Sequence, residues 1–241
     1  MRSLTAATLA AAATAASSQT VLFSESEFDP NDWTATPSFL FGAVQPGQTQ
    51  SVSTARFTAG NPANSFLVQQ HMLDSPFNSS VAPVLMNDWT YDPSSEGAIE
   101  SISFSMRTIN VSDLSPAFGT PRVFLMQDGR LYISSQVGGS FFGFGFDEQT
   151  QIRNFSGAVE TNFIEIMPNA GIDLNSHPDF NGSTIHFGFG TTLTPTDLGG
   201  QGLVTRAIGI DDVSFRIQTV PTPGVAAAGL AGLVLTRRRR A

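Results

Sequence analysis

The sequence has no cysteine and no lysine, and only 13% of its residues are charged, about half of the usual share of roughly 25%. Without cysteine, the chain cannot form a disulfide scaffold, a thiol nucleophile or a cysteine-ligated zinc or iron–sulfur site. No run of 18 or more apolar residues occurs, so no segment has the length expected of a full membrane span. Hydrophobic residues make up 41% of the 241 residues, which excludes disorder over the whole length and is enough for a packed core.

The charges are distributed unevenly along the chain. Seven of the 12 arginines and all 20 acidic residues lie between residues 19 and 219, so this body carries a formal charge of −13. The other five arginines lie at the two ends and are Arg2, Arg237, Arg238, Arg239 and Arg240. Because an acidic body repels phosphate backbones, nucleic acid is not an expected partner.

The N-terminus has the order of a secretory signal peptide. Arg2 precedes the apolar, alanine-rich stretch Leu4–Ala16, which is followed by the small residues Ser17 and Ser18. We therefore predict a signal peptide over residues 1–18, with cleavage before Gln19. The alternative is a buried N-terminal helix, but the stretch has neither a polar face nor a capping residue.

Residues 220–241 form a second segment of distinct composition. Pro221 and Pro223 precede the apolar stretch Val225–Thr236, and the four terminal arginines follow. As a helix, twelve residues rise about 18 Å, well short of the roughly 30 Å of a bilayer core. This order of a proline-containing break, a short apolar stretch and a basic end is the layout of a processed sorting tail. The alternative is an amphipathic helix that packs on the body.

This layout resembles the PEP-CTERM sorting signal of exported bacterial proteins, whose pattern is Val-Pro-Glu-Pro, a hydrophobic stretch and an arginine cluster. Thr222 stands where that family usually has glutamate. The resemblance implies that an exosortase-type membrane enzyme recognises the tail during a transient membrane association. It also implies a final location at the cell surface or in an extracellular matrix.

Between residues 20 and 219 the dominant hydrophobic period is two, which is typical of strands buried on one face. Ile102, Phe104 and Met106 alternate with polar residues, and the same alternation recurs in three further segments, 142–146, 185–189 and 213–217. Asp128-Gly129 between two such runs predicts a hairpin. The sequence therefore predicts an all-β fold, an antiparallel β-sandwich of the jelly-roll kind, as one domain over residues 19–219.

Two short motifs near the ends of the body add to this prediction. The segment 28–33 and the segment 209–215 resemble the opening and the last strand of jelly-roll carbohydrate-binding and concanavalin-like modules. The resemblance implies a structural calcium ion between Asp29 and Asp211. Counting by two from Val213 also places Asp211 on the core-facing side, where a carboxylate needs a partner or a metal. The alternative is that Asp211 lies outside the buried part of the strand or caps a turn.

Only two tryptophans and two tyrosines are available for stacking against sugar rings. Trp89 and Tyr91 lie on the same face of one expected strand and are flanked by Asn87, Asp88 and Asp92, whose side chains can bind hydroxyl groups. They form the predicted carbohydrate platform. The alternative is that both rings pack in the core.

Catalysis has little support in the sequence. The three histidines do not have zinc-protease spacing, and no nucleophile-elbow motif occurs. Glu160 and Glu165 would lie on opposite faces of a continuous strand, which makes them a poor acid and base pair. We expect a non-catalytic module that binds polysaccharide. The alternatives are a self-associating matrix protein without a specific glycan and, with less support, a glycan-degrading enzyme.

The two terminal segments make a testable prediction about processing. Mass spectrometry of the exported protein should find a mature chain that begins at or near Gln19 and lacks the terminal arginines, because both segments are expected to be removed. A mature form that retains Arg240 would contradict the prediction for the tail.

Overall fold

The computed structural model describes residues 18–41, 50–58, 65–73, 79–111, 117–135, 151–167, 171–195 and 204–220. The predicted signal peptide and sorting tail lie almost entirely outside these ranges, as does the strand predicted over residues 142–146. In the described part of the chain, no helix is long and apolar enough to cross a membrane.

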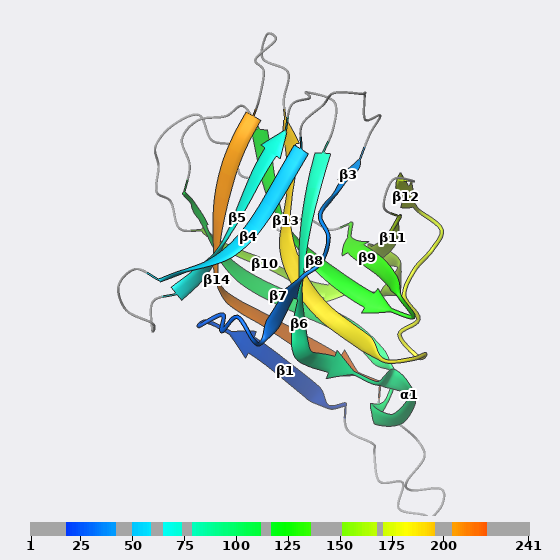
Figure 1. Ribbon diagram of the computed structural model, residues 1–241. Coiled ribbons are helices and arrows are strands. Elements are labelled where there is room, and N and C mark those ends of the chain that lie inside the picture. The colour runs from blue at the N-terminus through cyan, green and yellow to red at the C-terminus, as the bar shows by residue number, and fades with distance from the viewer. Residues whose placement is uncertain are drawn as a thin grey trace, which may run out of the picture.

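Two antiparallel sheets pack face to face and form a β-sandwich, as the alternation predicted (Figure 1). The six-stranded sheet has the order β10-β7-β14-β5-β4, and β1 also pairs with β14. Its strands are β1 (Thr20–Glu25), β4 (Gln50–Thr58), β5 (Ser65–Leu73), β7 (Ile99–Asn110), β10 (Gln151–Ala158) and β14 (Val204–Thr219).

The eight-stranded sheet has the order β12-β11-β9-β8-β13-β6-β2, and β3 also pairs with β6. Its strands are β2 (Trp33–Ala35), β3 (Phe39–Phe41), β6 (Ser79–Tyr91), β8 (Ala117–Gln127), β9 (Arg130–Ser134), β11 (Phe163–Met167), β12 (Gly171–Asp173) and β13 (Ile185–Pro195). Helical structure is confined, among the described residues, to the short turns α1 (Pro93–Glu96) and η2 (Glu160–Asn162).

The predicted hairpin between β8 and β9 is confirmed. Asp128 and Gly129 connect the two strands with φ angles of 52° and 76°. A two-residue turn of this kind needs positive φ at both positions, which aspartate tolerates and glycine favours. The alternation in β7 is confirmed as well, since Ile102, Phe104 and Met106 are buried in the core between the sheets.

A chain of buried hydrogen bonds joins the two sheets away from the aromatic core. His71 on β5 contacts Ser80 Oγ through Nδ1 at 2.6 Å and Thr191 Oγ1 through Nε2 at 2.7 Å. Thr191 donates its hydroxyl hydrogen to Gln69 Oε1 at 2.8 Å, so Thr191 accepts from His71. Nε2 therefore carries the proton of a neutral imidazole, and Nδ1 accepts a hydrogen bond from Ser80.

The environment of His71 opposes a positive charge. Burial lowers the pKa of its imidazole from 6.5 to about 4. In the pairing of β5 with β14, the residue opposite His71 is the buried Arg206. In the unfolded chain the imidazole has its ordinary pKa, so between pH 6.5 and 4 the unfolded state binds more protons, and stability falls as the pH is lowered.

We predict that lowering the pH from 7 to 4 reduces the free energy of unfolding of the wild type by about 3 kcal/mol more than that of His71→Gln, because glutamine does not titrate. Urea unfolding at both pH values measures the difference. His186→Gln, which changes an exposed histidine of β13, is the matched control and should follow the wild type. Equal losses in wild type and His71→Gln would contradict the role of His71.

Candidate functional site

The predicted carbohydrate platform lies in the core. The exposed fractions of Trp89 and Tyr91 are 7% and 1%, and both residues belong to the cluster packed between the sheets. Tyr91 donates its hydroxyl hydrogen to the carbonyl of Gly97 at 2.7 Å. The prediction that these rings stack against a sugar is therefore wrong, because both lie on the inward face of β6.

Trp89 is instead a centre of the core packing. Its ring stacks on Phe23 of β1 at a centroid distance of 5.7 Å and an angle of 15°. The edge-to-face contact with Phe215 of β14 has a distance of 5.5 Å, and Phe189 of β13 lies at 6.5 Å. The contacts with Phe23 and Phe215 join the two sheets, which explains why a residue flanked by polar side chains is buried.

Asp211 does not lie on the core-facing side, which corrects the second site prediction. Arg107 and Ser105 are two positions apart on β7, but their partners Asp211 and Ser214 are three positions apart on β14. The extra residue is a β-bulge, and Asp212 in it has a φ of 45°. The bulge reverses the alternation, so counting inward residues by two across it fails.

The bulge places two carboxylates beside one guanidinium on the outer side of the sheet. Arg107 contacts Asp211 Oδ2 at 3.4 Å and Asp212 Oδ2 at 2.5 Å. Burial raises the pKa of Asp211, and the neighbouring charge of Asp212 adds to this shift. The backbone N–H of Asp212 and the charge of Arg107 act in the opposite sense and lower the pKa of Asp211, so this carboxylate has a positively charged partner in its own chain.

Asp29 lies in an exposed loop with other acidic side chains. Its Oδ1 accepts hydrogen bonds from the backbone N–H of Asn31 at 2.9 Å and from the Asn31 side chain at 2.8 Å. Desolvation raises the pKa of Asp32, and the charges of Asp29, Glu25 and Asp88 raise it further. Over the described ranges, no three histidine or acidic side chains are grouped so that they could hold a metal ion. Calcium binding by Asp29 and Asp211 stays a prediction.

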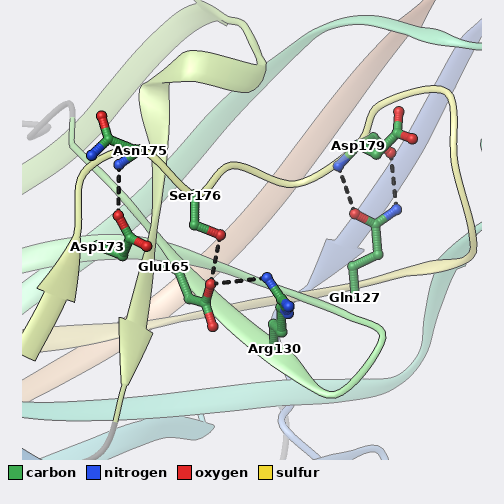
Figure 2. A network of polar contacts seen from close by, with 7 residues as sticks. All are labelled: Gln127, Arg130, Glu165, Asp173, Asn175, Ser176 and Asp179. Carbon is green, nitrogen blue, oxygen red and sulfur yellow. Dashed lines mark hydrogen bonds and ion pairs between the residues drawn. The ribbon is translucent and has the colours of Figure 1, made fainter. Parts of the chain in front are cut away.

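The carboxylates at the far end of the eight-stranded sheet hold a loop in place (Figure 2). Glu165 Oε2 accepts from Ser176 Oγ at 2.5 Å and from Arg130 at 3.3 Å. The Gln127 amide donates to the carbonyl of Asp179 and accepts from its backbone N–H, as Figure 2 shows. These side chains are engaged in fixing residues 174–183, so the arrangement is structural.

The outer face of the six-stranded sheet, the side away from the core, carries a row of uncharged polar side chains. Ser24, Ser214, Ser105 and Asn154 are register partners on the adjacent strands β1, β14, β7 and β10. None of the four side chains forms a hydrogen bond with another described residue. Strands lie about 4.8 Å apart, so this row, which we call the serine row, extends about 14 Å.

The same face has an aromatic patch on its other half. Phe57 of β4, 55% exposed, contacts Phe66 of β5 at a ring distance of 5.2 Å. The ring of Phe66 lies against Gly209 of β14, where an added Cβ would stand 3.2 Å from the ring. A larger residue at this position would push the ring away by a few tenths of an ångström, so glycine favours this close approach. We call Phe57, Phe66 and Gly209 the phenylalanine platform.

Sequence reasoning missed the phenylalanine platform. The sequence analysis considered only tryptophan and tyrosine as sugar-stacking rings and left the 20 phenylalanines aside. A signal was present in Ser51, Ser53, Ala55 and Phe57, which alternate as exposed residues of β4. In a strand with polar residues at that parity, Phe57 belongs to the solvent face.

Comparisons with known proteins return solved structures of low similarity. No protein-family model matches the chain, and no curated protein does. A carbohydrate-binding module studied for specific mannan recognition is 15% identical, with a TM-score of 0.36, over 84% of this chain and 99% of the module. The VP2 subviral particle of infectious bursal disease virus is 11% identical, with a TM-score of 0.22, over 92% of this chain and 49% of VP2.

Because Trp89 lies in the core, its truncation is expected to reduce stability, which truncation of an exposed ring would not do. Trp89→Ala should lower the unfolding free energy by about 3–5 kcal/mol, because it leaves a cavity between the sheets. Urea unfolding measures this loss. Phe57→Ala, a truncation of an exposed ring, is the control and should change stability by less than about 1 kcal/mol. Near-native stability of Trp89→Ala would contradict the core role.

Proposed function

We propose that this chain is an exported surface protein whose β-sandwich binds a neutral polysaccharide on the outer face of the six-stranded sheet, without cleaving it. The observation that carries the proposal is the presence of the phenylalanine platform and the serine row on the same outer face of one sheet, on either side of the bulge. Aromatic rings stack on the apolar faces of sugar rings, and hydroxyl and amide groups both donate to and accept from sugar hydroxyls.

The electrostatics of the body favour a neutral ligand. A formal charge of −13 between residues 19 and 219 repels acidic polysaccharides. On the outer face, Arg107 is paired with both Asp211 and Asp212. These two carboxylates are therefore engaged and adjacent, whereas glycoside hydrolysis needs two carboxyl groups that flank the scissile bond. This arrangement supports binding without hydrolysis.

The sequence supports the surface location in this proposal. The signal peptide over residues 1–18 would direct export, and an exosortase-type enzyme would process the tail over residues 220–241. A protein delivered in this way would meet polysaccharides outside the cell.

Affinity electrophoresis of the purified chain in gels that contain mannan, xylan or β-glucan tests the proposal. At least one polysaccharide should retard the wild type, and Phe57→Ala should weaken the interaction about tenfold, equivalent to about 1.4 kcal/mol. Ile172→Ala, which truncates a 45% exposed apolar residue on the other sheet, should bind like the wild type.

Two outcomes would contradict the proposal. Mobility unchanged by all three polysaccharides would remove carbohydrate binding, and retardation that Phe57→Ala leaves intact would remove the phenylalanine platform from the site. A reducing-sugar assay on the retained polysaccharide separates binding from hydrolysis, and release of reducing ends would show that the chain is an enzyme.

A further inference from the structure

Strand β4 leaves one edge of the six-stranded sheet open. Its nine residues, Gln50–Thr58, pair with β5 along their whole length without a register shift. No described strand pairs with its other side. An edge strand that is long and regular and contains no proline or lysine exposes a row of backbone N–H and C=O groups that can pair with another strand.

The other described edges are shorter than β4 or carry a bulge. β1, which pairs with β14 alone, has six residues against nine in β4 and ends at the acidic Glu25. β10, at the opposite edge of the same sheet, has a bulge between Phe155 and Ala158, and Gly157 in it has a φ of 70°. β12, β2 and β3, at the edges of the eight-stranded sheet, have three residues each. Bulges and short strands are common ways to protect an edge, and β4 has neither.

The charge distribution also favours β4 as a contact between copies of an acidic protein. β4 has no acidic residue, although the whole chain has a formal charge of −8. Its one charged side chain, Arg56, donates to the carbonyl of Glu27 at 2.9 Å and to Ser65 Oγ at 2.9 Å. Arg56 is thus bound to its own chain, and two copies that meet at β4 bring no carboxylates of this strand together.

We propose that β4 pairs antiparallel with β4 of a second copy of this chain and so joins two six-stranded sheets into one. A two-fold axis at Thr54 aligns all nine residues and places Ser53 opposite Ala55 of the second copy. Residues of equal parity then meet, so both outer faces lie on the same side. The two phenylalanine platforms would share one surface and could bind one polysaccharide together, a consequence that rests on the proposed function, whereas the pairing itself does not.

The oligomeric state of the purified full chain tests the pairing. Light scattering during size exclusion over a wide concentration range should show a dimer. Ser53→Lys should weaken the dimer at least about tenfold, because the two lysines would lie diagonally across the two-fold axis and their positive charges would repel each other. Ser156→Lys makes the same change at an exposed position of the bulged edge strand β10 and should leave the dimer intact.

Thr54→Cys provides a test that does not depend on weakening the dimer. The chain has no native cysteine, so a disulfide can form only between introduced residues. Mild oxidation should yield covalent dimers of Thr54→Cys and few of Ser156→Cys, because only Thr54 lies at the axis. A monomer at all concentrations, or a dimer that withstands Ser53→Lys, would overturn the proposal, and neither outcome bears on glycan binding by the monomer.

Discussion

The sandwich depends on aromatic contacts that cross between its two sheets. Trp89 and Phe187 on the eight-stranded sheet both contact Phe23 and Phe215 on the six-stranded sheet. Phe215 extends the cluster to Phe104 on β7 at a ring distance of 4.8 Å. Since the chain has no cysteine and so no disulfide, the burial of these apolar side chains is the main interaction that holds the two sheets together.

One β-bulge determines how the candidate site is arranged. At Asp211–Asp212 the alternation of β14 reverses, so that Ile210 and Val213 both point into the core. The two aspartates lie outside, where Arg107 pairs with them. The bulge also lies between the segment of β14 that pairs with β5 and the segment that pairs with β1. It therefore separates the phenylalanine platform from the serine row on the outer face.

The outer face of the six-stranded sheet and its open edge meet at strand β4. β4 contributes Phe57 to the platform and also forms the free edge of the sheet. A protein that binds an extended polymer gains strength from several sites on one surface, since the second contact is intramolecular once the first has formed. A carbohydrate-binding face that continues across two copies fits both the binding and the matrix interpretations of the sequence.

The sequence alone determined the class of fold, because side chains that alternate with period two can be buried on one face only if the chain forms strands. It likewise located the hairpin at Asp128-Gly129, where the local turn chemistry is decisive. The sequence did not determine the position of the predicted site residues in the same way. Trp89 has the same polar neighbours whether its strand faces the core or the solvent, and Asp211 changes face through a single extra residue. Which face each strand turns to the core, and which strand is left at an edge, depends on pairings between residues far apart in the chain. Local patterns do not contain those pairings, and only the tertiary structure decided them.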